Sequence, residues 1–129
     1  MIFGVGTDIA KVRRFERWVR TPGMVERFFS QEERLPSAAS DVSRLCQHYA
    51  ARFAAKEAFA KALGTGLRFE LRDVCVRKNG AGRPYLFLSG SALRLCRNVC
   101  GPEYSAHLSL SHEKEYAIAV VVVEIIGKL

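Results

Sequence analysis

The sequence predicts a single α+β domain, residues 1–129, in which a mostly antiparallel sheet packs against one long helix and shorter helices. Paired segments that alternate apolar and polar residues predict antiparallel strands. An alanine-rich stretch with helical periodicity predicts the long helix, and strands and helices do not alternate as they do in βαβ units. A chain of 129 residues, 49% of them hydrophobic, is long enough to form its own core.

The first thirty residues are expected to form one strand and two helices. Residues 2–5 are a short apolar strand that should break at the Gly6-Thr7-Asp8 segment. Residues 9–20 place apolar side chains at helical spacing, with basic residues on the opposite face, and predict a helix. The segment MVERFF, residues 24–29, predicts a second, short helix.

The long helix is expected between residues 41 and 64. Before it, Ser30 and Glu33 form a capping-box pattern, which predicts a further turn of helix, and Pro36–Ser40 reads as a loop. Gly64 is a favourable C-terminal cap. Small side chains on one side of the helix should let another element approach closely; they are Ala50, Ala51, Ala54, Ala55, Ala58 and Ala62.

The second half of the chain predicts two strand pairs and one helix. Residues 73–78 and 84–89 alternate with period two around the glycine-containing turn NGAGR and predict a hairpin. Residues 91–100 predict a short helix. Residues 106–112 and 116–126 predict two further strands, paired through a charged turn.

The apolar run at residues 116–126 is interrupted by Glu124 and is too short to cross a bilayer as a helix. Val120–Val123 is apolar at consecutive positions, so both faces of this strand should be covered. The N-terminal residues do not resemble a signal peptide. Four cysteines without a C-x-x-C pair favour free thiols, and we expect a cytoplasmic protein without a membrane partner.

Twenty Lys and Arg against 13 Asp and Glu give a formal net charge of +7, which favours an anionic partner. Charge alone does not choose among nucleic acid, a phosphorylated small molecule and an acidic protein. A small basic nucleic-acid-binding domain is therefore an alternative. It has little support, because the chain lacks a recognisable nucleic-acid motif and its aromatic residues are not interleaved along a basic strand.

Asp8 and Glu57 are the strongest candidates for chemistry. Asp8 ends the predicted first strand, where it could bind a metal ion or simply cap the helix that follows. Glu57 and Lys61 lie one helical turn apart beside the alanine face of the long helix. On spacing alone, such a pair is more often a solvated ion pair that stabilises a helix by about 0.2–0.5 kcal/mol.

A site with only two carboxylates would suit Mg²⁺, which keeps several waters and takes further ligands from substrate phosphates. Basic side chains available to bind those phosphates are Arg52, Lys61, Arg13, Arg14 and Arg17. The segment Gly64–Gly66 could approach a phosphate through backbone N–H groups, although so short a glycine pattern is more often a turn.

A polar strand face is expected near the C-terminus. His107, Ser109 and Ser111 alternate and therefore share one face, which is typical of a strand that lines a ligand groove. Serine–histidine catalysis has little support, because the chain contains no G-x-S-x-G elbow.

Three segments together resemble the holo-acyl-carrier-protein synthase family, the short 4′-phosphopantetheinyl transferases. They are GVGTDIAKVRRF at the N-terminus, ARFAAKEAFAKALGTG in the middle and HLSLSHEKEYAIAVVV near the end. The turn NGAGRPYL is similar to the family's hairpin, although one residue longer than expected. The resemblance covers essentially the whole chain.

The resemblance implies an activity and the residues that carry it. The enzyme would transfer 4′-phosphopantetheine from coenzyme A to a serine of apo-acyl-carrier protein, release adenosine 3′,5′-bisphosphate and support fatty acid biosynthesis. Asp8 and Glu57 would bind Mg²⁺, and Glu57, Lys61 and Asp8 would be catalytic. The residues implied for coenzyme A binding are Arg52, Lys61, Gly64, Pro84, His107, Ser109 and Ser111. Arg44 lies in a segment outside the resemblance and is a further candidate for contact with the 3′-phosphate.

The resemblance also implies partners. An acidic acyl-carrier protein would dock on a basic surface formed by Arg13, Arg14, Arg17 and Arg20. The chain would assemble as a homotrimer with active sites in clefts between subunits. A subunit that binds coenzyme A without catalysis is a third, weaker alternative.

Overall fold

The computed structural model describes residues 1–36 and 41–127, so the predicted loop at Pro36–Ser40 falls mostly outside the described residues. In chain order the helices and strands are β1 (Ile2–Lys11), α1 (Phe15–Arg20), α2 (Met24–Phe28), α3 (Val42–Leu63), β2 (Val74–Lys78), β3 (Pro84–Leu88), α4 (Gly90–Cys100), β4 (Tyr104–His112) and β5 (Tyr116–Ile125). Short 3₁₀ turns lie at Val12–Arg14, Gln31–Glu33 and Leu71–Asp73.

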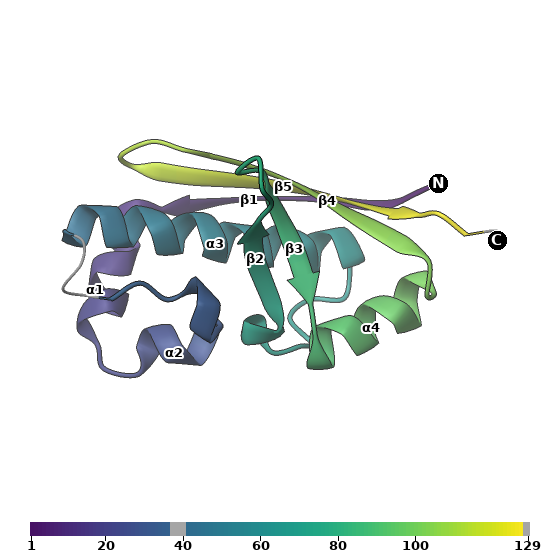
Figure 1. Ribbon diagram of the computed structural model, residues 1–129, viewed down its shortest axis with the longest axis horizontal. Helices are drawn as coiled ribbons and strands as arrows, with labels where there is room; N and C mark the ends of the chain where they lie inside the picture. The colour runs from purple at the N-terminus through teal and green to yellow at the C-terminus, as the bar shows by residue number, and fades with distance from the viewer. Residues whose placement is uncertain (37–40, 128–129) are drawn as a thin grey trace.

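The long helix α3 lies between two layers (Figure 1). On one side is an antiparallel sheet in the order β1-β5-β4. On the other side are α1, α2 and the antiparallel β2–β3 hairpin, with α4 beyond the hairpin (Figure 1). The predicted α+β class with an antiparallel sheet against one long helix is therefore confirmed.

Most of the local predictions are confirmed. The Ser30–Glu33 capping box is present, and the Asp41 side chain accepts from the Arg44 N–H at the start of α3. Gly64 ends α3 with φ 74°, a conformation that glycine adopts without strain. Helix α4 begins at Gly90, one residue before the predicted start, with Ser89 at the N-cap position, and the Ser91 hydroxyl donates to Asp73 Oδ2 at 2.6 Å.

The prediction of a short first strand followed by a helix from residue 9 is wrong. Strand β1 continues to Lys11, and Asp8 and Ile9 pair with Ala119 and Ile118 of β5. The spacing of Ile9 fits a helix, but pairing with a strand more than a hundred residues away decides the conformation. Asp8 therefore lies within a strand and does not cap a helix.

The approach of α3 to the sheet depends on two glycines of β1. A Cβ on Gly6 would overlap the carbonyl oxygen of Ala58 and lie 2.6 Å from the backbone nitrogen of Ala62. A Cβ on Gly4 would overlap the carbonyl oxygen of Ala62. The backbone of β1 thus rests on the backbone of α3, and the predicted role of the helix alanines in close packing is confirmed, since Ala58 is fully buried.

The two faces of the three-stranded sheet differ in their exposure to solvent. Val121 and Val123 are buried against α3, whereas Val120 and Ile118 on the opposite face are 37% and 43% exposed. The prediction that both faces are covered is therefore wrong within a single chain. We call this opposite face the outer face; its exposed apolar residues also include Val5 and Ile9.

We predict that Gly6→Ala lowers the free energy of unfolding by about 1–3 kcal/mol or more, because the new methyl group must push β1 away from α3. The matched control is Gly80→Ala, since a Cβ at Gly80 meets open space; it should change stability by less than about 0.5 kcal/mol. Urea denaturation measures both. Equal stabilities for the two variants would contradict the close contact.

Candidate active site

Asp8 and Lys61 meet at the junction of β1 and α3. Because Gly4, Gly6 and Asp8 share one strand face, the side chain of Asp8 points to the helix. Lys61 Nζ lies 3.1 Å from Asp8 Oδ1 and donates to the carbonyl of Thr7 at 3.0 Å. The Asp8 side chain is 17% exposed and that of Lys61 is 56% exposed, so the lysine can turn to a ligand at the surface.

Glu57 completes the cluster one helical turn before Lys61. Burial raises the pKa of the Glu57 carboxyl above its ordinary value, and the negative charge of Asp8 raises it further. The positive charges of Lys61 and Arg14 act in the opposite direction. Glu57 is therefore not the partner of Lys61 in a simple surface ion pair; it shares an electrostatic environment with Asp8.

The chemistry of this pair fits a hard divalent cation. Two carboxylates, one of them partly desolvated, supply the oxygen ligands that Mg²⁺ prefers. Among the residues that the structure describes, three or more His, Cys, Asp or Glu side chains do not gather in a metal-binding cluster. A metal ion held by Asp8 and Glu57 would thus take its other ligands from water and from a substrate.

A cavity of about 460 Å³ lies between β2 and α3, and we call it the β2–α3 cavity. It brings together Arg52 and Pro84, two residues that the sequence predicted for coenzyme A, and it also contains Arg44. Its walls are formed by Arg44, Gln47, His48, Ala51 and Arg52 of α3, Val76 and Lys78 of β2, Gly82, Pro84, Leu110 and His112. Three side chains with permanent positive charge make it suited to an anion.

Arg52 is the most notable of these side chains. Its Nη1 donates to the carbonyl of His48 at 3.3 Å. Its Nε is buried and has no hydrogen-bond partner among the described residues. A buried N–H of this kind ordinarily has a partner, so the guanidinium has capacity left for a ligand in the cavity.

His48 was not identified from the sequence. Its Nε2 lies 2.6 Å from the carbonyl oxygen of Glu33, and since a carbonyl only accepts, the ring donates through Nε2–H. Burial, followed by the positive charge of Arg52, lowers the pKa of His48 to about 4. The one available signal was its position four residues before Arg52 on the same helix face.

The predicted strand residues lie elsewhere. His107, Ser109 and Ser111 share one face of β4, as predicted, but they pair with Val122, Val120 and Ile118 and so lie on the outer face. Within one chain the structure does not bring them together with Asp8 and Glu57. The neighbours on the inner face, Leu110 and His112, line the β2–α3 cavity in their place.

The predicted basic surface is present on the exterior of the chain. Arg13, Arg14, Arg17 and Arg20 are all exposed. Arg14 stacks on Phe53, with its guanidinium carbon 5.2 Å from the ring centroid. Arg13 and Arg20 line a cavity of about 570 Å³ together with Lys11 and Lys114. These positive charges suit an acidic partner.

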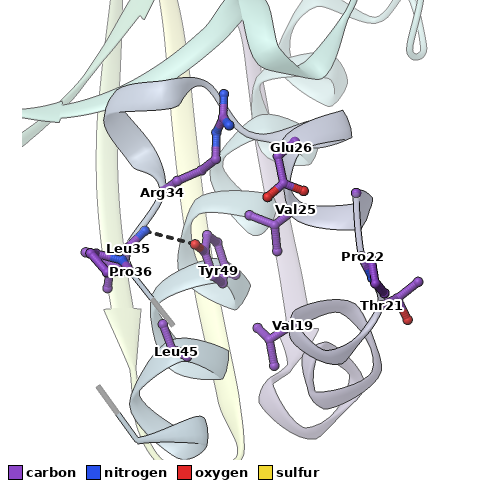
Figure 2. A pocket seen from close by; sticks show the side chains of 11 residues that line it. Val19, Thr21, Pro22, Val25, Glu26, Arg34, Leu35, Pro36, Leu45 and Tyr49 are labelled. Atoms are coloured by element: carbon purple, nitrogen blue, oxygen red, sulfur yellow. Dashed lines mark hydrogen bonds between the residues drawn. The ribbon is translucent and has the colours of Figure 1, made fainter. Parts of the chain in front are cut away.

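Figure 2 shows another cavity, of about 330 Å³, between the α1–α2 connection and α3. It is lined by apolar side chains such as Val19, Val25 and Leu45, and its Tyr49 hydroxyl accepts from the Leu35 N–H at 3.0 Å. No residue predicted for the site is among the described residues that line it. It therefore lies apart from the Asp8–Glu57–Lys61 cluster.

Two further predictions concern the chain as a whole. The four cysteines are buried with free thiols. In the described part of the chain, no helix is both long and apolar enough to cross a membrane.

The family model of the 4′-phosphopantetheinyl transferase superfamily matches residues 4–121. A holo-[acyl-carrier-protein] synthase of Treponema denticola is 48% identical to this chain, and the match covers 96% of the chain and 99% of that protein. A Geobacter sulfurreducens protein of the same name is 44% identical, with 96% and 98% covered.

Solved structures give the same result. A holo-(acyl-carrier-protein) synthase from Bacillus anthracis in complex with CoA (3′,5′-ADP) has a TM-score of 0.79 and 38% identity, with 98% of this chain and 99% of that chain covered. The Neisseria meningitidis enzyme has a TM-score of 0.77 and 36% identity, with 96% and 99% covered. This chain belongs to the holo-[acyl-carrier-protein] synthase family of 4′-phosphopantetheinyl transferases.

Proposed function

We propose that this chain transfers 4′-phosphopantetheine from coenzyme A to a serine of apo-acyl-carrier protein, with Mg²⁺ as cofactor. The observation that carries the proposal is one of geometry. Helix α3 holds Glu57 and Lys61 beside Asp8 and, one to two turns earlier, holds Arg52 in the basic β2–α3 cavity. A phosphoryl-transfer site needs groups that position the reacting phosphate and groups that bind the rest of the donor.

The β2–α3 cavity would hold the adenosine end of coenzyme A. Arg52 and Arg44 would bind its phosphates, since guanidinium groups pair well with phosphate oxygens. Pro84 would lie near the adenine, and Gly64, at the end of α3 just beyond Lys61, would approach the phosphates through its backbone. A Bacillus anthracis relative with CoA (3′,5′-ADP) bound supports this ligand class.

Each residue of the cluster has a distinct role in the proposed reaction. Asp8 and Glu57 would hold Mg²⁺, which supplies charge neutralisation at the pyrophosphate when bound. The serine oxygen forms a bond to the phosphorus of the phosphopantetheine, and the bond from that phosphorus to the adenosine 5′-phosphate oxygen breaks. Glu57, directly or through a water molecule, accepts the serine proton, which its raised pKa favours. Lys61 neutralises the departing adenosine 3′,5′-bisphosphate.

The acidic acyl-carrier protein would dock on the exposed arginines of the first helical region, Arg13, Arg14, Arg17 and Arg20. Opposite charges of this kind speed association and weaken with salt. The modified carrier would serve fatty acid biosynthesis, and the buried free thiols support a reducing cytoplasm as the location.

We further propose a homotrimer that covers the outer face. Val5, Ile9, Ile118 and Val120 form an exposed apolar face, which is unusual for a monomer in water. His107, Ser109 and Ser111 share this face. In an assembly they would approach the site of a neighbouring subunit, which would account for their separation from Asp8 within one chain.

The first prediction from the proposed function is the reaction itself. The chain should add phosphopantetheine to apo-acyl-carrier protein in the presence of coenzyme A and Mg²⁺, as measured by the mass of the carrier. Asp8→Ala and Glu57→Ala should each abolish transfer, because each removes a ligand that positions the pyrophosphate. The control Glu70→Ala changes an exposed carboxylate outside the site and should keep full activity.

Several results would contradict this function. Absence of an adduct across several carriers would overturn it, and coenzyme A binding without transfer would favour the non-catalytic subunit. Tight, salt-sensitive binding of RNA or DNA without coenzyme A binding would favour the nucleic-acid-binding alternative. Full activity of either alanine variant would overturn the metal assignment.

The second prediction concerns the proton affinity of Glu57. Since the charge of Asp8 raises the pKa of Glu57, Asp8→Asn should lower that pKa. Lys61→Met should change it in the opposite direction, because Lys61 lowers it. A carboxyl-carbon NMR titration measures both variants against the unmodified chain. A Glu57 pKa that does not respond to either substitution would show that the three groups are not coupled.

The third prediction tests the assembly. Val120→Asp places a charge in the outer face and should convert a trimer to monomers, as measured by light scattering after size-exclusion chromatography. Leu67→Asp alters an apolar residue that is 50% exposed, against 37% for Val120, and lies outside the sheet; it should leave the trimer intact. A monomeric unmodified chain at micromolar concentration would refute the proposed trimer.

A further inference from the structure

Glu33 and Lys56 form an ion pair that is completely enclosed by protein. Lys56 Nζ lies 2.7 Å from Glu33 Oε1, and both side chains are 0% exposed. They are the only two buried charged residues in the described part of the chain. A buried ion pair is often no more stabilising than apolar residues of the same size, so stability alone does not explain why a chain keeps one.

The hydrogen bonds of this pair connect α3 to β2. Lys56 Nζ donates to the carbonyl of Leu71 at 2.9 Å and to that of Val74. Glu33 Oε2 accepts from the Val76 N–H at 3.1 Å. The lysine ammonium thus donates to three acceptors, and β2 is held both by the lysine of α3 and by the glutamate.

Glu33 also contacts α3 through its backbone. Its carbonyl oxygen accepts from His48 Nε2–H at 2.6 Å, and the carbonyl of His48 in turn accepts from Arg52. Val76 of β2 and His48 of α3 both line the β2–α3 cavity. Glu33 therefore bonds to both elements that form this cavity, to β2 through its carboxylate and to α3 through its carbonyl.

We propose that the Glu33–Lys56 pair is a positioning device that sets the spacing between the two walls of the β2–α3 cavity and thereby the affinity for the adenosine bisphosphate end of coenzyme A. The inference rests on the proposed function, because it assumes that coenzyme A occupies this cavity. Lys56 and Glu57 are neighbours on α3 but point in different directions, to β2 and to Asp8. Loss of the pair should therefore weaken donor binding and leave the reacting carboxylates in place.

The test compares Glu33→Gln, Lys56→Met and the double variant with the unmodified chain. We expect each variant to raise the Kd and the KM for coenzyme A by about tenfold while kcat stays within about twofold, because a misplaced wall costs binding that is equal in ground state and transition state. Coenzyme A binding is measured by calorimetry without a carrier, and kcat and KM by the carrier-modification assay on the folded fraction.

The double variant separates positioning from stability. A single substitution leaves one buried charge without a partner and should lower the melting temperature most, whereas the double variant removes both charges at similar volume and should recover much of it. If the double variant is folded and stable but still has a raised Kd for coenzyme A, the result supports the positioning role. If neither single variant folds, the double variant alone decides the matter. Cys96→Ala removes a buried side chain of α4 outside the cavity; it should lower stability without changing the Kd.

Two results have different meanings. A double variant that binds coenzyme A like the unmodified chain overturns the positioning role and leaves the proposed function intact. Failure of the unmodified chain to bind coenzyme A overturns the proposed function and this inference with it.

Discussion

The contact of the β1 backbone with the α3 backbone is the constraint on which the site depends. Gly4 and Gly6 have no side chain where α3 passes, and Ala58 and Ala62 present the smallest side chains of the helix. Short carboxylate side chains from a strand and a helix can influence each other only if the two backbones are close. The charge of Asp8 acts on Glu57 for this reason, and the glycines are as much part of the site as the carboxylates.

Burial of α3 on almost every side explains where its polar residues lie. Alanines face the sheet, Lys56 reaches β2, and Arg52 faces the β2–α3 cavity. Glu57 is half-buried and Lys61 is exposed, so this part of the helix is open to a ligand from solvent. Desolvation raises the pKa of Glu57 and lowers the pKa of Arg52 and of Lys56, and together with the charge of Arg52 it lowers the pKa of His48 to about 4. The same packing that stabilises the helix tunes the proton affinities around it.

The sequence predicted those features that depend on local pattern. The α3 helix follows from its period and its C-terminal cap at Gly64. The β2–β3 hairpin follows from alternation around a glycine-containing turn. Asp8, Glu57 and Lys61 stood out from the sequence as candidates for chemistry, but spacing alone favoured a solvated Glu57–Lys61 ion pair. The family resemblance was what brought the three residues together in one predicted site.

The errors and omissions depend on contacts distant in the sequence. Ile9 fits a helical period, but its strand conformation is decided by pairing with Ile118. Alternation showed that His107 and its neighbours share a face, and it could not show which face α3 covers. The Glu33–Lys56 pair was missed because a charged residue in a helical pattern is ordinarily solvated, and its burial follows only from the position of β2.

The length and rigidity of α3 have a consequence for selectivity under the proposed function. Arg52 and Glu57 are fixed to one continuous helix, so the two groups proposed to hold the donor's phosphates are separated by a helical rise of about 7–8 Å along a single rigid element. No hinge lies between them that could close on a shorter or differently shaped nucleotide. The chain would therefore discriminate among donors by the fixed distance between these two residues. An analogue that lacks one phosphate would lose the contact with that residue, and the helix could not bend to restore it.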